Sequence, residues 1–356
     1  MSAQTFYGTR FATFEEKPEE EGGGGEEKKP LSVDVRMKRV ILRYRSEISI
    51  LMPEGEFNAS LAKSIGQFSS IATAKYNFLR GEMGFASTNI FTKFRVVPQL
   101  SAYDKLNFIP IFNDGKTWQR EQGLMLGGRL LFKLPANTLS SIRYIRYSRP
   151  SPDNLQSIKL EKATMLSQTF GGEIDSVSFI GFTHSGIFEL QLDKAFPVRT
   201  SDLDYAQMHL RSRGQAVNSH IGFEGEFNWT TLLNGTYAPP RYLGGRRSLA
   251  GFDHNEFSGL NSLLLKLNST IILTRGTHKF VGGVSFSNIA WRLYYDLGQV
   301  GDEKTMTKFA TYHHSLGSGF VLGNLYRDQH LWELFFSIHK AAERNRGLKF
   351  YIGIKV

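Results

Sequence analysis

The chain of 356 residues contains no cysteine. This absence excludes disulfides, zinc–thiolate sites and cysteine nucleophiles together. The sequence also lacks the run of roughly 18–20 apolar residues that a membrane helix requires. A membrane is not excluded by that second absence, because a β-barrel strand crosses the bilayer with about 9–11 alternating residues.

Patterns that carry catalysis or bind metal are missing as well. There is no Gly-x-Ser-x-Gly turn and no phosphate-binding loop, so we expect neither an enzyme nor a cofactor. No His-Glu-x-x-His spacing occurs, and the neighbours His313 and His314 would point to opposite faces of a strand, so we expect no metal site. The 43 Lys and Arg residues give a net charge of +10, but they are scattered along the chain. We therefore do not expect a nucleic-acid partner.

What the sequence does contain is alternation of apolar and polar residues. In the segment 217–232, Phe223 and Phe227 oppose Glu224 and Glu226. Two carboxylates on one strand face would be costly in a dry core, but they are well placed in a wet lumen. The pattern predicts an all-β fold, a transmembrane antiparallel β-barrel formed by residues 1–356 as a single domain, with the lipid bilayer as partner.

Counting the alternating segments gives sixteen strands, eleven before residues 234–259 and five after them. The first strand is expected at 5–14 and the second at 31–45, with a disordered charged loop at 15–30 between them. Residues 46–68 and 150–172 are poorly patterned. Residues 234–259 are rich in glycine and arginine, and we expect them to form a long sixth loop that folds into the lumen.

Four stretches of this sequence resemble motifs of one known family, the bacterial surface antigen superfamily, whose barrel domains occur in BamA, TamA, FhaC and Sam50. The first stretch, residues 243–252, is similar to the sixth-loop motif and contains Gly244, Gly245, Arg246, Arg247, Leu249, Ala250, Gly251 and Phe252. The other three are 294–300 with Gly298, 314–320 with Gly317 and Gly319, and the alternation that ends at Val356. The resemblance covers residues 216–356 and implies the barrel domain alone, since no POTRA repeats precede it.

The resemblance implies that an arginine of the sixth loop enters the lumen and pairs with a carboxylate on the inner wall. Ala250 stands where the motif has this arginine, whereas Asp296 is present and shares the polar face with Arg292. We hypothesise that Arg246 or Arg247 pairs with Asp296 instead, because a guanidinium matches a carboxylate with two hydrogen bonds. The alternative is that both arginines are solvated in the loop.

As a function, the resemblance implies insertion or export of proteins across an outer membrane, with client or passenger proteins as partners. The barrel would close between residues 5–14 and 346–356, and this seam would open laterally. No secretory signal opens the chain, so we expect a mature or truncated bacterial protein, or one from an organelle outer membrane. Two alternatives remain: a non-enzymatic anchor or pore that forms the C-terminal translocator of a longer surface protein, and a soluble lipid- or carbohydrate-binding β protein.

Overall fold

The computed structural model describes residues 43–356 except for short gaps. The gaps are 53–54, 66, 79–80, 92–95, 111–115, 132–135, 151–157, 197–202, 236–237, 239–240, 247, 254–255, 280–284, 302–311, 324–332, 344–345 and 356. The predicted strand 5–14, the loop 15–30 and most of the predicted strand 31–45 lie outside the described residues. In the described ranges, no helix combines the length and the apolar character needed to cross a membrane.

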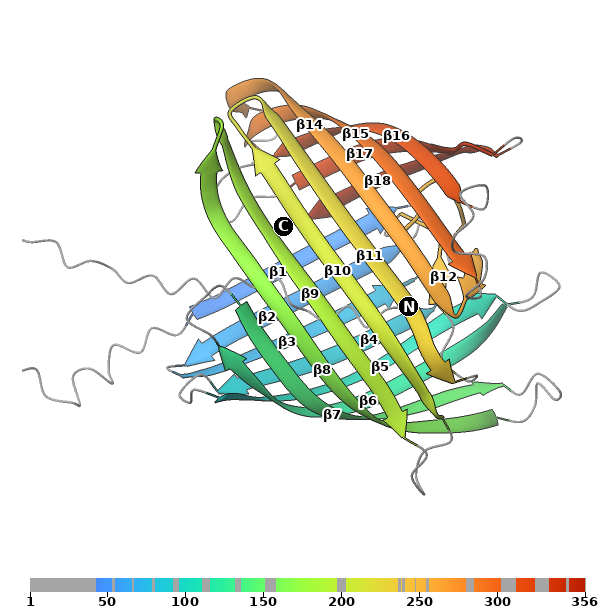
Figure 1. The fold of residues 1–356 in the computed structure, drawn as a ribbon. Coiled ribbons are helices and arrows are strands. Elements are labelled where there is room, and N and C mark those ends of the chain that lie inside the picture. The colour runs from blue at the N-terminus through green and yellow to red at the C-terminus, as the bar shows by residue number, and fades with distance from the viewer. Residues whose placement is uncertain are drawn as a thin grey trace, which may run out of the picture.

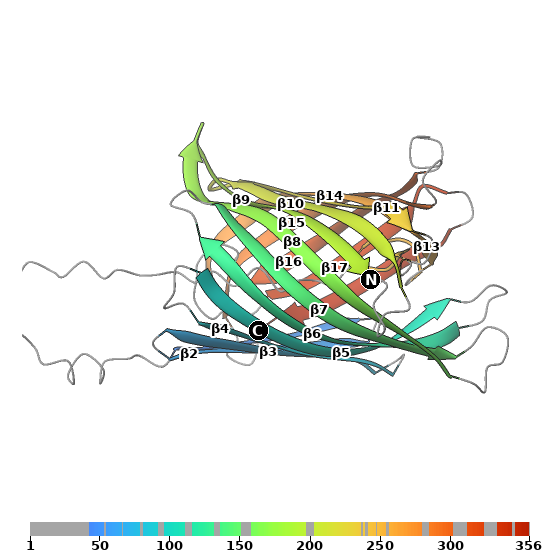
Figure 2. The same cartoon turned by 60° about the horizontal axis from the view of Figure 1, so that its bottom comes forward.

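Sixteen strands of the described residues form one closed antiparallel barrel (Figures 1 and 2). They are β1 (Arg43–Met52), β2 (Glu56–Ile65), β3 (Phe68–Asn77), β4 (Glu82–Phe91), β5 (Val96–Pro110), β6 (Lys116–Leu131), β7 (Ala136–Pro150), β8 (Ile158–Phe179), β9 (Phe182–Phe196), β10 (Tyr205–Val217), β11 (Ile221–Gly235), β14 (Asn261–Lys279), β15 (Ser285–Gly301), β16 (His313–Gly323), β17 (Glu333–Ala341) and β18 (Leu348–Lys355). Each strand pairs with the next one along the chain, and β1 pairs with β18 to close the ring. Two short strands, β12 (Arg241–Leu243) and β13 (Phe257–Gly259), form a separate sheet within the connection from β11 to β14.

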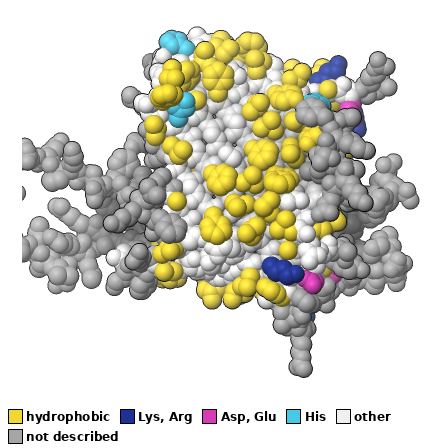
Figure 3. Space-filling view, viewed as in Figure 1, with side chains coloured by type: hydrophobic (Ala, Val, Ile, Leu, Met, Phe, Trp, Pro, Cys, Tyr) yellow, Lys and Arg dark blue, Asp and Glu magenta, His cyan; other side chains and the backbone are white. Residues whose placement is uncertain are grey.

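The two faces of the wall differ in polarity because side chains alternate across a strand. Large apolar side chains are exposed on the outside: Leu126 is 63% exposed and Leu316 61%. The inner face carries buried polar groups, among them Gln191, Lys266 and Asp296. Figure 3 shows the apolar side chains spread over one outer face, with charged side chains near its ends. An apolar outside around a polar inside is the arrangement of a barrel that spans lipid, so the predicted transmembrane fold is confirmed.

The connections divide the barrel into two ends. At one end, which we call the loop end, residues 236–260, 302–312 and 197–204 join neighbouring strands. At the opposite turn end most connections are shorter, and the β8–β9 turn consists of Ile180 and Gly181, both with positive φ (49° and 72°). Longer and shorter connections thus tend to alternate around the barrel.

The predicted total of sixteen strands is confirmed, as is the division into eleven before the sixth loop and five after it. The first two barrel strands of the described residues, β1 and β2, occupy 43–65, which includes most of the segment judged poorly patterned. Residues 150–172 were expected to be irregular, but β8 begins at Ile158. The physical reason is visible in β8, where Lys162 and Thr164 take outward positions and interrupt the apolar alternation.

Candidate functional site: a loop anchored on the inner wall

The sixth loop, between Gly235 and Asn261, folds back against the inside of the barrel. Its stem is the β12–β13 pair, in register from Arg241–Gly259 to Leu243–Phe257. Beyond the stem the chain turns on itself: the Gly245 N–H donates to the Phe252 carbonyl at 3.2 Å, and the Ser248 hydroxyl donates to the Gly244 carbonyl at 2.7 Å. We call residues 244–252 the loop tip. These bonds give the tip a fixed shape of its own.

Two tip glycines are required by the backbone conformation. Gly244 and Gly251 have φ angles of 120° and 92°, in the region that side-chain-bearing residues rarely adopt. A Cβ atom added to Gly251 would lie 2.7 Å from Ser315 Oγ and 2.9 Å from the Ala341 backbone nitrogen. The tip therefore approaches β16 and β17 so closely that only glycine fits at position 251.

Apolar side chains attach the tip to the wall. Leu249 and Phe252 are completely or almost completely buried and pack with Leu243, Leu264 and Ala341. The wall makes room for them at Gly298 of β15, where an added Cβ would lie 3.1 Å from a Leu243 methyl carbon and 3.3 Å from one of Leu249. Gly298, selected from the sequence as a motif residue, thus provides the surface on which the loop leucines rest.

The backbone of Ala250 is held from two strands. Its N–H donates to Asp296 Oδ2 of β15 at 3.0 Å, and its carbonyl accepts from the Ser315 hydroxyl of β16 at 3.0 Å. The cation beside the carboxylate is Lys266, whose Nζ lies 3.9 Å from Asp296 Oδ1 and donates to the Arg246 carbonyl at 3.1 Å. Asp296 therefore anchors the tip through a backbone N–H, which any residue except proline would offer at position 250.

The Arg246 side chain lies among aromatic residues of the inner wall. Its guanidinium sits over the ring of Tyr294 at 4.9 Å, with Phe335 at 5.5 Å and Tyr351 at 6.0 Å. Ala250 packs against Tyr351 and Phe335 as well. The Arg246 guanidinium and the Ala250 side chain therefore lie beside the same two aromatic rings. Arg246 thus contacts aromatic rings of the inner wall. That Arg246 or Arg247 pairs with Asp296 stays a prediction.

The remaining predicted site residues take supporting positions. Arg247 lies outside the described residues, and Arg292 donates to the Thr270 hydroxyl at 3.0 Å within the wall. An added Cβ at Gly317 would lie 2.4 Å from His339 Nδ1, so this glycine leaves the space in which the His339 ring packs between Tyr294 and Tyr351. At Gly319 an added Cβ would meet the Phe336 carbonyl oxygen of β17, so this position keeps two strands in close contact.

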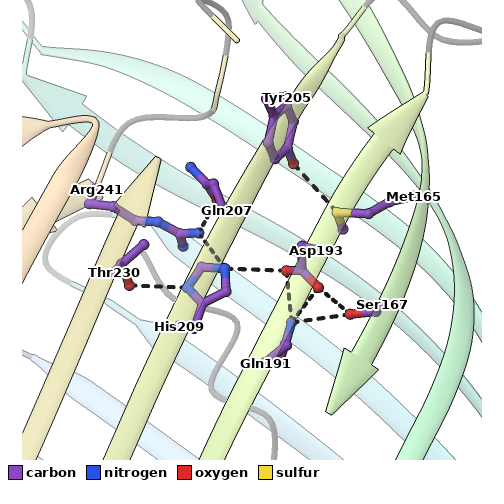
Figure 4. A network of polar contacts seen from close by, with 9 residues as sticks. All are labelled: Met165, Ser167, Gln191, Asp193, Tyr205, Gln207, His209, Thr230 and Arg241. Carbon is purple, nitrogen blue, oxygen red and sulfur yellow. Dashed lines mark hydrogen bonds and ion pairs between the residues drawn. The ribbon is translucent and has the colours of Figure 1, made fainter. Parts of the chain in front are cut away.

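A second anchor, at the stem, was missed by the sequence analysis. Arg241 reaches the inner wall of β10, where its guanidinium donates to Gln207 at 2.8 Å and lies 3.3 Å from His209 Nε2 (Figure 4). His209 also contacts Asp193 of β9 at 3.2 Å and Thr230 of β11 at 3.0 Å. The sequence contains two signals for this anchor. They are the polar residues at alternate positions of β10 and an arginine just ahead of the glycine motif.

Ion pairs at the loop end join the sixth loop to the last connection of the barrel. Glu256 pairs with Arg346 at 2.5 Å, and Asp253 pairs with Lys349 of β18 at 2.7 Å. Phe257 stacks on His313 with ring centroids 3.8 Å apart. The loop is therefore attached to β10 through Arg241, and to β15–β18 through the tip and the residues that follow it.

The contacts described above hold the sixth loop in position against the inner wall. A search of the described residues for three or more His, Cys, Asp or Glu side chains able to hold a metal ion finds none. Among the buried charged residues, Asp193, Lys266 and Asp296 belong to the contacts given above.

No protein-family model and no curated protein sequence matches the chain. Its fold is similar to that of solved outer-membrane barrels. BamA from Haemophilus ducreyi lacking POTRA domains 1–3 is 13% identical, with a TM-score of 0.63 over 89% of this chain and 70% of that one. CdiB from Escherichia coli is 13% identical, with a TM-score of 0.62 over 87% and 62%. CdiB from Acinetobacter baumannii is 10% identical, with a TM-score of 0.57 over 88% and 59%. The chain spans less than two thirds of either CdiB chain, and at these identities the likeness confirms the expected barrel fold.

Proposed function

We propose that this barrel resides in a bacterial outer membrane and that it inserts or exports client proteins there. The observation that carries the proposal is the seam between β1 and β18. Only four residue pairs close it among the described residues, from Ser49–Lys355 to Met52–Ile352. By comparison, β17 and β18 pair from Glu333–Lys355 to Lys340–Leu348.

Such a seam is the weakest ladder of the barrel, because each lost residue pair removes backbone hydrogen bonds. The strands are staggered there: residues 348–351 of β18 extend beyond β1 at the loop end. The seam strand at the start of the barrel is Arg43–Met52, which corrects the expected closure through residues 5–14. A lateral opening at this position would give a polypeptide in the lumen access to lipid.

The sixth loop lies against the seam strand from inside. Tyr351 of β18 packs with Ala250 and with the Arg246 guanidinium, and Lys349 pairs with Asp253. A movement of the loop would therefore alter the contacts that hold β18 on its inner side. This coupling between the lumen and the seam supports transport or insertion over a role as a passive anchor.

The test uses the cysteine-free background. The variant Ile50→Cys/Ile354→Cys places two thiols at a seam pair, and Phe336→Cys/Ile352→Cys places them at a matched apolar pair of β17 and β18. Paired residues on antiparallel strands have Cα atoms about 4.5–5.5 Å apart, which suits a disulfide. Both oxidised variants are reconstituted in liposomes, and folding of a urea-unfolded eight-stranded barrel is followed by its gel mobility without heating.

We expect the unmodified protein and the β17–β18 control to accelerate folding of the client over empty liposomes. The seam disulfide should abolish the acceleration, and reductant should restore it. Equal activity of the oxidised seam variant would contradict the proposal. Ionic conductance without any acceleration would favour the alternative of an anchor or pore.

A further inference from the structure

Strand β8 extends past its neighbour β7 at the turn end. The ladder between the two strands ends at the pair Ala136–Gly172, whereas β8 continues to Phe179. On its other side β8 stays paired with β9 as far as the pair Phe179–Phe182. Among the described residues, the segment 173–179 therefore pairs with β9 alone, and its hairpin projects at the upper left of Figure 1. This segment, which we call the β8 edge, presents backbone N–H and C=O groups to a further strand over roughly 20 Å.

The β8 edge has an apolar face and a polar face. Ile174, Val177 and Phe179 point outward, and each of them is at least 50% exposed. Glu173 and Ser178 point inward and are exposed as well. Ile174 and Val177 are three positions apart, so regular alternation would place them on opposite faces, but the β-bulge between them brings both to the outward face. The edge therefore continues the polarity of the barrel wall.

Contacts within the hairpin hold the β8 edge in place. The His184 ring of β9 lies 6.2 Å from the Phe179 ring and 6.3 Å from the Phe182 ring, measured between centroids. The His184 Nε2 atom also lies 3.2 Å from the Phe179 carbonyl oxygen. The Phe182 ring in turn lies 6.2 Å from that of Phe223 on β11. An edge that is fixed before a partner arrives loses less conformational entropy when the partner binds.

The turn of this hairpin combines backbone strain with an exposed apolar side chain. Two-residue turns with positive φ at both positions favour Asn-Gly or Asp-Gly, because most other side chains strain the backbone there. Ile180 occupies the first position with a φ of 49°, and its side chain is 77% exposed. A β-branched residue does not favour such a turn, and strain of this kind clusters at functional sites. Ile180 extends the apolar surface of the β8 edge to the tip of the hairpin.

The chemistry of an unfolded barrel protein matches this edge. The short turns of an outer-membrane barrel face the periplasm, from which a client would arrive. Such a client contains segments of about 9–11 residues in which apolar and polar residues alternate. A segment laid along the β8 edge would place its apolar side chains beside Ile174 and Phe179 and its polar side chains beside Glu173. The backbone would supply the ladder, and the side chains would select the segment, as in other cases of strand addition.

We infer that the β8 edge binds an extended segment of an unfolded client barrel by strand addition. The inference rests on the proposed function and adds a docking place to it. This place is separate from the seam, because β8 lies about halfway around the ring from β1.

The probe is a fluorescent peptide with the sequence of residues 265–275 of β14, a segment whose own place in the barrel is already paired on both sides. Fluorescence anisotropy follows its binding to the detergent-refolded barrel, and native mass spectrometry reports the oligomeric state. A second peptide carries N-methyl groups on its backbone amides, which removes the donors of a ladder.

Three variants locate the binding. The edge variant Val177→Lys/Phe179→Lys places charges on the β8 edge, which opposes strand addition. The matched control Phe91→Lys/Leu273→Lys places them on β4 and β14, at outward residues that are at least 45% exposed. The oxidised seam variant Ile50→Cys/Ile354→Cys closes the seam. Gel mobility without heating verifies that each variant is folded.

We expect the unmodified barrel, the matched control and the oxidised seam variant to bind the peptide equally well. The edge variant should bind it about tenfold more weakly, which corresponds to about 1.4 kcal/mol, and the methylated peptide should not bind. Equal binding by the edge variant, or binding of the methylated peptide, would overturn the inference.

Two further outcomes would assign the contact elsewhere and would also overturn the inference. Loss of binding in the oxidised seam variant would place the peptide at the seam, and dimers of the barrel that the edge variant abolishes would give the edge to a second copy of this chain. A barrel that binds the peptide at the edge without accelerating client folding would contradict the proposed function alone, so the two failures are distinguishable.

Discussion

Asp296 holds the sixth loop through a peptide N–H, and this explains how the loop can remain seated with an alanine at position 250. The Ala250 backbone is contacted from β15 by Asp296 and from β16 by Ser315. The Arg246 guanidinium lies over aromatic rings of the wall. At the residue scale, the anchoring carboxylate and the loop cation make separate contributions that can be measured one by one.

We expect Asp296→Ala to destabilise the barrel by about 1.5–3 kcal/mol, the range for a hydrogen bond to a charged group. Asp296→Asn should cost less, because its amide oxygen can still accept from Ala250. The free energy of unfolding in urea, followed by tryptophan fluorescence of the refolded protein, gives both values. The control is Asp204→Ala, which removes a carboxylate from an exposed ion pair and should cost about 0–1 kcal/mol. Equal effects of Asp296→Ala and the control would contradict the assignment.

Arg246 should contribute through its charge over the rings. Arg246→Met retains length and apolar contact but loses the cation, and we expect a loss of about 1–2 kcal/mol, in the range of partly desolvated cation–π pairs. Arg246→Lys should retain part of this energy. The same urea experiment measures it, and an Arg246→Met variant as stable as the parent would show that only the apolar part of the side chain matters.

A substitution at Gly251 tests how closely the tip approaches the wall. Gly251→Ala adds a methyl group where the φ angle is 92° and where Ser315 Oγ would be 2.7 Å away. Backbone strain of this kind costs about 1–3 kcal/mol, and the contact adds to it. The matched control is Gly347→Ala in the last connection, where an added Cβ has no atom within 4 Å. Similar unfolding energies for the two variants would mean that the tip is not seated on β16.

At the scale of elements, the sixth loop is fixed at its stem and at its tip, and the two anchors can be separated. Arg241→Ala removes the stem contacts with Gln207 and His209 but leaves the tip contacts intact. We expect larger and noisier single-channel currents in planar bilayers, because the loop stem becomes mobile in the lumen. Arg213→Ala is the control, since Arg213 pairs with Glu224 within the wall. Identical currents in both variants would argue against a stem anchor.

The sequence predicted the later elements better than the earlier ones. From Asn261 onward, apolar residues alternate with Lys266, Asn268 and Thr270, and the five strands expected after the sixth loop are present. In β2 the outward Lys63 and the inward Ala62 weaken the contrast between the faces, so the pattern fades. The loop motif indicated which residues would meet the wall. It did not indicate that Asp296 accepts a hydrogen bond from a backbone N–H, because such a bond does not depend on the type of side chain at the donor position.

The Arg241 anchor was missed for a related reason. Arg241 is 34 residues from Gln207 and 32 from His209 in the chain. The register of β10 with β9 and β11 brings Asp193 and Thr230 to His209. Polar residues along an inner face are expected in any wet lumen. Their presence alone therefore did not indicate which of them contact Arg241. Contacts between a loop and a wall depend on the path of the loop, which alternation does not encode.

At the scale of the whole molecule, the apolar outside of the wall predicts a depth-dependent response to charge. Leu126→Arg places a cation on the outer face and should destabilise the barrel in liposomes by about 2–4 kcal/mol near the bilayer midplane, less toward its borders. Gln215→Arg on the inner face should change stability by about 0.5 kcal/mol or less, as surface substitutions do. Unfolding of both variants in liposomes measures the contrast. No penalty for Leu126→Arg would instead favour the soluble β protein considered above.

The β1–β18 seam also determines when folding can finish. Ser49 pairs with Lys355, so the ring closes only after nearly the entire described chain has been arranged. Contacts between residues so distant in sequence slow folding, because the entropy of closing a long loop is lost before the contact forms. Until that moment the sheet has two open edges, which are sites for pairing with other chains. Refolding should therefore show a late phase in which gel mobility changes after strand content is complete, and this phase should slow when Asp296 is removed.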